Sequence, residues 1–447
     1  MTLAEQLPSL RTSVPPRLEP GIWPATAHLA AGRDISVGAV RLTDIVRKYR
    51  TPTYVLDEED VRSACRAYRH AFHDGEVAYA GKAFLNRAMA RLVDDEALSL
   101  DVCSAGELAV AASVDFPGDR VILHGNVKTP EDLDAAVGYG VGRIVLDSMT
   151  EIPRVAAATP TRQRVLLRVT PNVDIGGLAA VTTGIDDQKF GFPIADGVAL
   201  EAARRVLAQP GLELAGLHCH IGSQVGKPEA YEKATTRLLA LMAAIRVRYG
   251  HHMAELNIGG GHAIAYQTGD CALDVPTLAE RLRWLVRDRC RALRIPPPRL
   301  TVEPGRGIIG RAMVALYRVN AIKRRPGRRT YVAVDGGMSD NIRPALYGAH
   351  YSVRLVGRTT TTADEIVTVV GRHCEAGDIL ARDVPLSGDL RPGDVLAMPA
   401  AGAYQLSMAS NYNGVLRPAV VAVHGGLSRV VTRRETEADL LARDIAL

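Results

Sequence analysis

The chain has 447 residues, of which 47% are hydrophobic and 23% are charged, and its formal net charge at pH 7 is +5. These fractions are typical of a globular protein and exclude disorder and collagen-like folding, while the length exceeds one ordinary domain and predicts two. So weak a net charge gives no reason to expect nucleic acid or a membrane as a partner.

Several features that would indicate other classes of protein are missing. No run of about 18 apolar residues is present to span a membrane, and the segment Met1–Pro8 lacks the basic and apolar parts of a secretory signal. The six cysteines show no CxxC spacing, which argues against a zinc site or a disulfide scaffold. We therefore expect a cytoplasmic protein without a metal.

The predicted elements begin with a strand-like run, Ile35–Leu42, and we expect residues 1–45 to pair with a C-terminal β domain. From Val77 to Arg306 one pattern then recurs, in which a short β-branched run ends in a polar or glycine residue and a helical stretch follows. The eight runs are Val77–Lys82, Leu98–Cys103, Arg120–His124, Arg143–Asp147, Val165–Arg168, Leu214–His220, Glu255–Gly259 and Arg299–Glu303.

Strands that alternate with helices imply a parallel sheet and an α/β fold. Eight such units fit a (β/α)8 TIM barrel, whose usual size is about 250 residues. A doubly wound open sheet is the alternative, but no GxGxxG follows the first strand. We predict the barrel over residues 46–312.

After Ala312 the runs are joined by turns such as Asp335–Gly337 and Arg391–Asp394. They are Val314–Ile322, Thr330–Val334, Ser352–Val356, Glu365–Val370, Asp394–Met398 and Ala419–His424. We predict an all-β domain over residues 313–447.

Polar and glycine residues stand at the carboxyl ends of the predicted barrel strands, where barrels place their active sites. They are Lys82, Asp101, Cys103, His124, Asp147, Arg168, His218, His220, Gly259–Gly261 and Glu303–Arg306. Any one of them could simply end a strand, but that interpretation explains the whole set less well.

The loops after strands seven and eight predict a phosphate site. The triple glycine Gly259–Gly261 lets the backbone approach a ligand and offers N–H donors. The loop Glu303–Arg306 adds a second glycine turn and a guanidinium. Barrels often bind phosphate between these two loops. Each loop alone could be an ordinary turn, and together they favour phosphate.

Only seven of the 54 basic residues are lysines, which codon bias explains most simply, and only Lys82 stands at a predicted strand end. Burying an ammonium group is costly, so a covalent role competes with that of a wall residue. A lysine, a phosphate cradle and the carboxylate of Glu303 suggest pyridoxal phosphate, with Lys82 as its Schiff-base lysine and Glu303 against the pyridine nitrogen. His220 could stack on the ring or be a hydrogen-bonded wall residue.

From about Thr51 to Pro418 the sequence resembles the diaminopimelate decarboxylases, pyridoxal-phosphate enzymes of the alanine-racemase-like fold (fold type III). The shared motifs are Tyr79–Phe84, Asp101–Leu108, Gln188–Gly191, His218–Gln224, Gly259–Gly261, Glu303–Arg306, Asp335–Arg343 with Ala345–Tyr347, His373–Asp378, Gly402–Tyr404 and Ser410–Asn413. So many motifs in one order leave little room for chance. The fold that the resemblance implies is a TIM barrel plus a C-terminal β domain.

The resemblance also implies a role for each position. Lys82 would carry pyridoxal 5'-phosphate, and Cys374 would donate the proton after decarboxylation. The cofactor would be surrounded by His220, Ser223, Gly259, Gly260, Gly261, Glu303, Pro304, Gly305, Arg306 and Tyr404. The substrate would contact Arg306, Arg343, Tyr347, Glu375 and Tyr404. Cys374 and Glu375 would come from the second subunit of a homodimer.

The implied reaction converts meso-2,6-diaminopimelate to L-lysine and carbon dioxide, the last step of lysine biosynthesis. The residue types agree, since Arg306 and Arg343 are forks suited to carboxylates and Glu375 can take the distal ammonium. Ornithine or lysine as substrate would leave these cations unpaired. Without its motif, Cys374 would be interpreted as a buried structural cysteine.

Three departures from the family pattern leave fine specificity open. The loop Asp174–Gly184 has glycine and leucine where a Thr-His pair is usual, His262-Ala263 follows the triple glycine, and Gln405-Leu406 follows Tyr404. The first departure lies near the predicted substrate entrance, and we interpret the other two as packing variants. The alternative function is a same-fold decarboxylase of another basic amino acid or a carboxylated polyamine. A racemase, a non-catalytic relative and a lysine-dependent aldolase fit the motifs less well.

Overall fold

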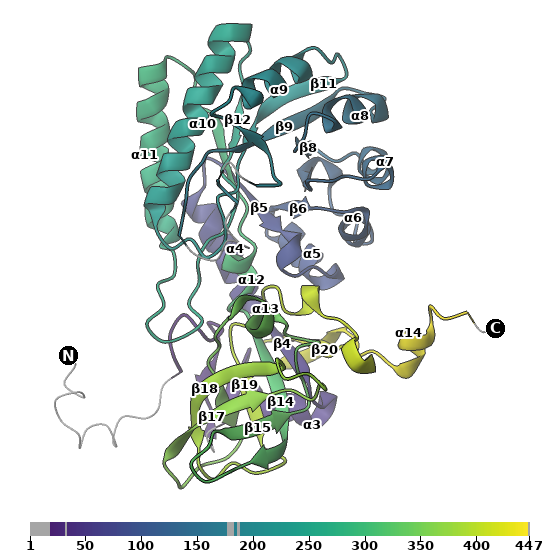
Figure 1. The fold of residues 1–447 in the computed structure, drawn as a ribbon, viewed down its shortest axis with the longest axis vertical. Coiled ribbons are helices and arrows are strands. Elements are labelled where there is room, and N and C mark those ends of the chain that lie inside the picture. Colours follow the sequence, from purple (N-terminus) through teal and green to yellow (C-terminus); the bar gives the residue numbers. More distant parts are fainter. Residues whose placement is uncertain (1–17, 32–33, 177–182, 186–187, 446–447) are drawn as a thin grey trace, which may run out of the picture.

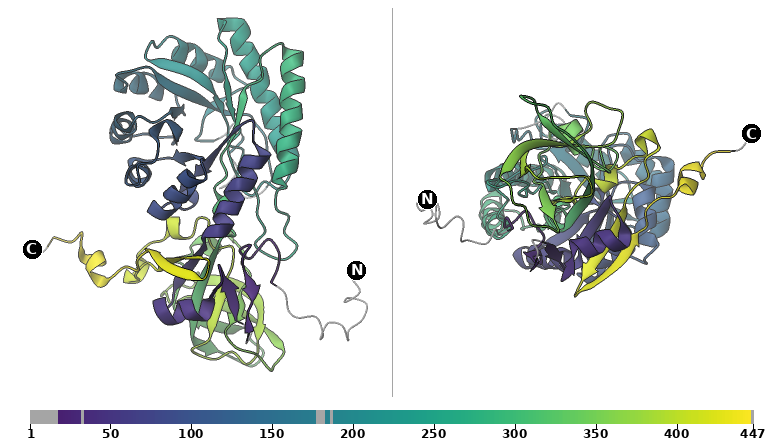
Figure 2. Two further views of the ribbon diagram at one scale, coloured as in Figure 1. Left: turned by 180° about the vertical axis from the view of Figure 1, so that it is seen from behind. Right: turned by 90° about the horizontal axis from the view of Figure 1, so that it is seen from below.

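The computed structural model describes residues 18–31, 34–176, 183–185 and 188–445. A parallel barrel ringed by helices forms one half of the molecule, and a β domain forms the other (Figures 1 and 2). The predicted α/β class, a TIM barrel with a C-terminal β domain, is confirmed. No helix of the described chain is both long and apolar enough to cross a membrane.

Eight parallel strands close the barrel, because β13 pairs with β5 and β8 pairs with β9. The strands are β5 (Glu76–Ala80), β6 (Ser99–Val102), β7 (Val121–Leu123), β8 (Arg143–Leu146), β9 (Gln163–Thr170), β11 (Leu212–His218), β12 (Glu255–Asn257) and β13 (Arg299–Val302). Each of the eight predicted runs overlaps one of them. A short strand, β10 (Phe192–Pro193), pairs with β9 in addition.

Helices cover the outside of the barrel (Figure 1). They are α4 (Glu58–Ala71), α5 (Arg87–Asp95), α6 (Ala105–Ala112), α7 (Pro130–Tyr139), α8 (Glu151–Ala158), α9 (Val198–Leu207), α10 (Pro228–Tyr249) and α11 (Val275–Leu293). Local sequence sets their ends. Helix α7 begins with a capping box between Thr129 and Asp132 and ends at Gly140, which is left-handed. The side chain of Asn86 accepts a hydrogen bond from the Met89 amide at 2.8 Å and so caps α5.

The inside of the barrel is layered, since every second residue of a strand faces inward. A separate buried apolar cluster forms the middle layer, with Ala78, Ile122, Val145, Leu166 and Ala215. In β8, Arg143 precedes this layer by two residues and Asp147 follows it by two, and both are buried. The same spacing in β9 gives Arg164 and Arg168. An apolar layer therefore separates a charged layer at the amino ends of the strands from another at the carboxyl ends.

The β domain is a second sheet of mostly antiparallel strands, in the order β18-β17-β15-β14-β4-β20-β21, in which β19 also pairs with β14, and β16 pairs with β19. The strands are β4 (Thr53–Asp57), β14 (Met313–Lys323), β15 (Thr330–Val334), β16 (Arg354–Val356), β17 (Asp364–Val370), β18 (Ile379–Ser387), β19 (Val395–Met398), β20 (Ala419–His424) and β21 (Leu427–Thr432). Three short helices, α12 (Arg306–Ile309), α13 (Arg343–Tyr347) and α14 (Glu437–Leu441), complete this half of the chain.

Strand β4 precedes the barrel in the sequence but belongs to the second sheet, between β14 and β20. All five of its residues are buried. The range 46–312 that the sequence suggests for the barrel therefore includes one strand of the β sheet, because a buried run alone does not show which sheet will take it. The division into residues 1–45, 46–312 and 313–447 stays a prediction.

The N-terminal segment forms a small antiparallel sheet of its own. Its strands are β1 (His28–Leu29), β2 (Ile35–Val37) and β3 (Val40–Arg41), and α3 (Leu42–Tyr49) follows. This sheet lies against the β domain, where the Gly426 amide donates a hydrogen bond to the Gly38 carbonyl at 2.8 Å. The expected strand run Ile35–Leu42 is thus a hairpin that continues into a helix.

Candidate active site

A cavity of about 540 Å³ lies at the carboxyl ends of the barrel strands, where barrel and β domain meet. Seven of the predicted site residues line it, namely Lys82, His220, Ser223, Arg306, Arg343, Tyr347 and Tyr404. Gly259–Gly261 and Glu303–Gly305 are not among the lining residues and lie in the loops and strand ends around it. The structure therefore collects residues from both halves of the chain at one place.

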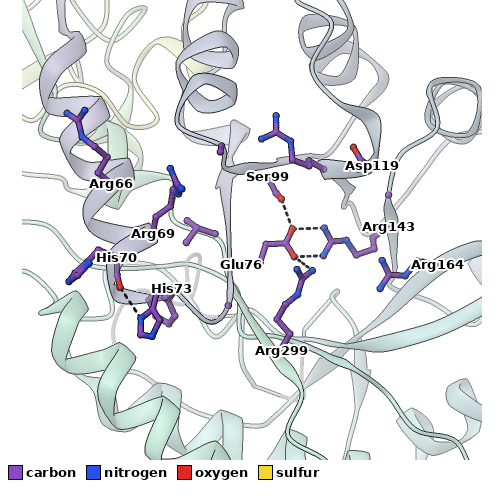
Figure 3. A pocket seen from close by; sticks show the side chains of 16 residues that line it. Arg66, Arg69, His70, His73, Glu76, Ser99, Asp119, Arg143, Arg164 and Arg299 are labelled. Atoms are coloured by element: carbon purple, nitrogen blue, oxygen red, sulfur yellow. Dashed lines mark hydrogen bonds and ion pairs between the residues drawn. The ribbon is translucent and has the colours of Figure 1, made fainter.

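A larger cavity, of about 870 Å³, lies at the amino ends of the strands (Figure 3). Its floor is an ion-pair network in which Glu76 accepts hydrogen bonds from Arg143, Arg299 and Ser99. Burial alone would raise the pKa of Glu76, but the hydrogen bonds and charge of Arg143 outweigh it and lower the pKa to about 2. Charge pairs at the amino-terminal face of a barrel serve stability, and barrels place their active sites at the carboxyl-terminal face, so we place the chemistry at the other end.

Lys82 lies in a short 3-10 turn, Gly81–Ala83, directly after β5. Its Nζ is 3.5 Å from Oδ2 of Asp101, which lies near the carboxyl end of β6, and the Lys82 side chain is 41% exposed because it faces the cavity. The buried Asp101 Oδ2 has no hydrogen-bond partner among the described residues. Burial would lower the pKa of Lys82, but the electrostatic effects of Asp101, Tyr404 and Glu303 together outweigh burial and raise it. The cavity thus holds an amine whose carboxylate partner can accept a further proton donor.

A second buried lysine, Lys128, does not compete for this role. Its Nζ donates hydrogen bonds to the carbonyl oxygens of Gly125 at 2.7 Å and Val145 at 2.6 Å, and to Glu151 at 3.2 Å. An ammonium group has three donors, and all three are used. Lys128 is therefore a structural residue of the loop that follows β7.

Glu303 follows β13 and is buried among three side chains. Its Oε1 lies 2.6 Å from Nδ2 of Asn257 and 2.8 Å from Nε2 of His124, and its Oε2 lies 3.2 Å from Nε2 of His218. Burial would raise the pKa of Glu303, but the two histidines outweigh it and lower the pKa well below its usual value. Because a carboxylate offers about four acceptor positions, Glu303 can take one further donor.

The triple glycine ties three strand ends together. A Cβ on Gly260 would lie 2.0 Å from the Glu303 carbonyl oxygen, and one on Gly261 would lie 1.9 Å from the Gly222 carbonyl oxygen. Two of its N–H groups are occupied, since Gly259 donates to Asn257 Oδ1 at 2.9 Å and Gly260 donates to His220 Nδ1 at 3.2 Å. Within the described chain, the Gly261 N–H has no acceptor. The loop therefore offers one free donor rather than several, and it also fixes the imidazole of His220.

The turn that carries Lys82 is packed by residues from two other loops. A Cβ on Gly305 would lie 2.9 Å from that of Ala83, and the Pro304 carbonyl accepts a hydrogen bond from the Ala80 amide at 3.3 Å. The Tyr404 amide, in the β domain, donates to the Ala83 carbonyl at 2.9 Å. Pro304, Gly305 and Tyr404 therefore help to set the position of Lys82.

Two arginines face the cavity with hydroxyl groups as partners. Nη2 of Arg306 donates to Ser223 Oγ at 2.8 Å, and Nη1 donates to the hydroxyl of Tyr266. Nη1 of Arg343 donates to the same Tyr266 hydroxyl at 3.0 Å and to that of Tyr351. Neither guanidinium has a carboxylate within 4.0 Å in the described parts of the chain. Two buried positive charges are thus available to anionic groups of a ligand.

Tyr266 and Tyr351 did not emerge from the sequence. Tyr266 stands in the loop after β12, and Tyr351 stands between α13 and β16. Neither lies in a motif or a periodic segment that would have marked it. Only the folded chain brings their hydroxyl groups to the two arginines.

Cys374 and Glu375 do not line the cavity of their own chain. They lie in the connection between β17 and β18, and the Cys374 side chain is solvent-exposed. The Cys374 amide donates to Asn413 Oδ1 at 3.2 Å, and the neighbouring His373 contacts Ser339 Oγ through Nε2 at 2.9 Å. These contacts hold the Cys374 backbone in a defined position on the surface of the β domain.

The departures from the family pattern lie close to the site. In the loop Asp174–Gly184, residues 177–182 lie outside the described residues, and Gly176 and Thr183 line the cavity. Thr183 Oγ1 donates to the His220 carbonyl at 2.7 Å. His262 is buried behind the triple glycine, where its Nδ1 lies 2.9 Å from the hydroxyl of Tyr68.

The arrangement fits pyridoxal phosphate on the residues' own chemistry. Lys82 supplies an amine that faces the cavity. Ser223, Arg306 and the free Gly261 N–H can hold a phosphate, as hydroxyl, guanidinium and backbone donors commonly do. Glu303 retains an acceptor position for a protonated ring nitrogen. The two arginines without carboxylates are buried donors that a bound anionic ligand would satisfy, and Asp101 Oδ2, which already lies 3.5 Å from Lys82 Nζ, can accept a further donor.

Comparison with known proteins also indicates a pyridoxal-phosphate enzyme, and the similarity extends over the whole chain. Residues 58–310 match a family model described as pyridoxal-dependent decarboxylase, pyridoxal binding domain. A diaminopimelate decarboxylase from Actinosynnema pretiosum subsp. auranticum is 54% identical over 445 residues, covering 100% of both chains. One from Mycobacterium tuberculosis is 44% identical and covers 96% of this chain and 98% of its own.

Among solved structures, the crystal structure of diaminopimelate decarboxylase from M. jannaschii in complex with L-lysine matches with a TM-score of 0.88. Its sequence is 29% identical, and the match covers 95% of this chain and 98% of that one. The likeness therefore includes the barrel and the β domain together. The chain belongs to the diaminopimelate decarboxylase family of pyridoxal-phosphate-dependent carboxy-lyases.

Proposed function

We propose that the protein decarboxylates meso-2,6-diaminopimelate to L-lysine and carbon dioxide, with pyridoxal phosphate as its cofactor. The observation that carries this proposal is the pairing of a reactive amine, Lys82, with two buried arginines that have no carboxylate partner. The full-length relatives named diaminopimelate decarboxylase support it. So does the related M. jannaschii structure, which holds L-lysine.

The cofactor would be held by residues that follow four of the barrel strands, β5, β11, β12 and β13. Lys82 would carry it, Ser223, Arg306 and Gly261 would hold its phosphate, and Glu303 would face its ring nitrogen. When bound, pyridoxal phosphate supplies an electron-poor ring that accepts the charge left as carbon dioxide departs. The low pKa of Glu303 keeps its carboxylate negative, which favours a protonated ring nitrogen beside it.

His220 would lie against the ring face as a neutral imidazole. Burial and the nearby positive charge of Lys82 lower the pKa of His220 well below its usual value. The Gly260 N–H donates to its Nδ1 and so fixes which nitrogen lacks a proton. A neutral ring adds no positive charge to a cavity that already holds three cations.

The distal end of the substrate would lie against Arg343 and Tyr347, which come from α13. Meso-diaminopimelate carries a carboxylate and an ammonium at that end, and the Arg343 fork suits the carboxylate. L-lysine keeps the L-configured centre of the meso compound. The held end must therefore be the L centre, and the reacting end must be the D centre.

We also propose a homodimer whose active site is shared between subunits. Cys374 would hold the proton on Sγ that replaces the lost carboxylate, and Glu375 would meet the distal ammonium. Both residues are exposed and lie outside the cavity of their own chain, which suits a contribution to the neighbouring subunit. Activity would then depend on association.

Mixing two inactive variants tests the shared site. Lys82→Ala and Cys374→Ala chains, unfolded and refolded together, should recover about a quarter of the wild-type activity, since half of the dimers are hybrids and each hybrid has one intact site. Recovery of no activity, with hybrids confirmed by mass, would overturn the shared site. Cys374→Ala alone should lower kcat about 100-fold or more and leave cofactor affinity nearly unchanged.

Carbon dioxide release on a substrate panel tests the reaction itself. The panel contains meso-, LL- and DD-diaminopimelate, L-lysine and L-ornithine. We expect release from the meso compound and a product of pure L configuration. Preference for lysine or ornithine would instead support a same-fold decarboxylase of basic amino acids, and racemised product would support a racemase.

We further propose that the protein works in the cytoplasm. All six cysteines are free, three of them exposed, as is usual in a reducing compartment. Fractionation of the producing cells, with activity assayed in each fraction, tests this. Activity confined to a secreted or membrane fraction would contradict it.

A further inference from the structure

Tyr266 holds an unusual position between the two arginines of the cavity. Its hydroxyl accepts hydrogen bonds from Nη1 of Arg306 and Nη1 of Arg343, the second at 3.0 Å. Arg306 is the first residue of α12, shortly after β13, and Arg343 comes from α13 in the second half of the chain. One phenol oxygen therefore links the phosphate side of the cavity to the predicted substrate side.

The surroundings fix this hydroxyl. The Tyr266 amide donates to Asp270 Oδ2 at 2.9 Å, and Ser352 Oγ donates to the Tyr266 carbonyl at 3.2 Å. The ring meets that of Tyr351 edge to face, with centroids 5.3 Å apart. Tyr266 is only 7% exposed. The barrel loop and the β domain thus hold the residue from both sides.

Without a ligand, the hydrogen-bond donors of Arg306, Arg343 and Tyr266 are not all satisfied. Two guanidinium groups share one neutral oxygen, and the Nε atoms of both arginines are buried without an acceptor in the described chain. A phenol oxygen has two lone pairs, and both are occupied by the arginines. The Tyr266 proton must therefore point elsewhere, and the cavity that the residue lines is where an acceptor can meet it.

We propose that Tyr266 is a specificity-determining residue. Its hydroxyl orients the Arg343 guanidinium toward the distal carboxylate of the substrate and donates its own proton to the same carboxylate. This rests on the proposed function. The hydroxyl holds Arg343 at a fixed place, so that a carboxylate arriving there receives the guanidinium and the phenol proton together. A substrate without that carboxylate leaves the Arg343 guanidinium and the Tyr266 hydroxyl without their acceptor, which is a strong ground for rejection.

The test is Tyr266→Phe, which keeps the ring against Tyr351 and removes the shared acceptor. The KM for meso-diaminopimelate should rise about tenfold or more, with kcat changed less than about threefold. The ratio of kcat/KM for the meso compound to that for L-lysine should fall by a similar factor. Tyr331→Phe, at an exposed position in β15, is the matched control and should match the wild type.

A purely structural role for Tyr266 predicts something else. It would weaken cofactor binding and lower kcat for every substrate alike, and this result would overturn the proposal. So would an unchanged KM and selectivity. Visible absorbance during titration with pyridoxal phosphate measures the cofactor affinity. For Tyr266→Phe we expect this affinity within about threefold of the wild type, because Arg306 retains its hydrogen bond to Ser223.

A second readout separates this proposal from the proposed function. Pimelate, a dicarboxylate of the same chain length without amines, should raise the melting temperature of the wild-type holoenzyme more than heptanoate, its monocarboxylate analogue. In Tyr266→Phe that difference should disappear. If the wild type did not decarboxylate meso-diaminopimelate but kept this difference, the proposed function would fail while the dicarboxylate site stood. Equal shifts by pimelate and heptanoate in the wild type would overturn the site.

Discussion

The two ends of the barrel use charge in opposite ways. At the amino ends of the strands, Glu76 and Glu255 are paired with arginines, and the Arg143 side chain, 4% exposed, contacts both. At the carboxyl ends, Arg306 and Arg343 have only hydroxyl partners, and Asp101 keeps one oxygen without a hydrogen bond. Both ends are lined by residues from the same strands, and an apolar layer separates them.

The difference shows where the fold satisfies its own charges and where it leaves them for a ligand. A buried charge without a partner costs free energy, so it persists where binding or chemistry uses it. The larger cavity, at the amino ends, has its floor charges paired (Figure 3). Cavity size alone would favour the amino ends of the strands, whereas the two arginines without carboxylate partners favour the carboxyl ends, where we propose the active site.

The largest effect should follow from changing the amine at the carboxyl ends. Lys82→Ala should lower the rate of carbon dioxide release by about four orders of magnitude or more, because the residue is part of the reacting group. Lys128→Met is the matched control, since Lys128 is buried but satisfied by carbonyl oxygens. It should lower stability and keep catalysis. Substantial turnover by Lys82→Ala would contradict the assignment.

Changing the amino ends should affect stability and leave chemistry intact. Glu76→Gln removes the charge that Arg143 and Arg299 share, and we expect a loss of about 3–5 kcal/mol in the free energy of unfolding. Urea unfolding measures this, with kcat/KM at a temperature where the variant is folded. Asp119→Asn, at an exposed carboxylate near the same cavity, should match the wild type. A fall in kcat/KM of Glu76→Gln would break the contrast between the ends.

Lowering the pH should weaken the stabilising contribution of Glu76. The pKa of Glu76 is lowered from 4.5 to about 2 in the folded chain, so its stabilising contribution is present above about pH 4.5 and is lost as the pH falls toward 2. The whole contribution amounts to about 3 kcal/mol. The stability difference between the wild type and Glu76→Gln should therefore narrow by about 2 kcal/mol between pH 6 and pH 3. A constant difference would contradict the low pKa.

The smallest of these effects concerns one arginine at the carboxyl ends. Arg343→Gln should lower kcat/KM for meso-diaminopimelate by about 30-fold, or about 2 kcal/mol, because the distal carboxylate loses its charged donor. Turnover of L-lysine, however slow, should not fall. Arg391→Gln, at a side chain that is 72% exposed, is the control. An equal loss for both substrates would indicate that Arg343 supports the fold rather than the substrate.

The barrel could be predicted because its signal is local. Each strand is a short apolar run that ends in a polar or glycine residue, as in Arg143–Asp147, and a helical stretch follows. Strand β4 could not be placed, since Thr53–Asp57 is buried on all sides and its neighbours, β14 and β20, lie more than 250 residues away in the sequence. Strand pairing over such distances leaves no local pattern.

The site residues also divide into those that could be predicted from the sequence and those that could not. Lys82, Glu303 and the glycine loops could be found because barrels place reactive groups at strand ends, and the family resemblance supplied Arg343 and Tyr404. Tyr266 could not be predicted, because its role depends on contacts with Arg306 and Arg343 that form only in the folded chain. The triple glycine was interpreted as a set of donors, whereas two of its three N–H groups are used within the protein.

Covalent trapping on pyridoxal phosphate tests the central claim most directly. The protein is titrated with the cofactor, the visible absorption band is recorded, and borohydride then fixes the cofactor to its lysine for mapping by mass spectrometry. With only seven lysines in the chain, the assignment is unambiguous. The account predicts a visible band that borohydride removes and a label on Lys82 alone. A label on Lys128 or another lysine, or a protein that stays colourless with added cofactor, would contradict it.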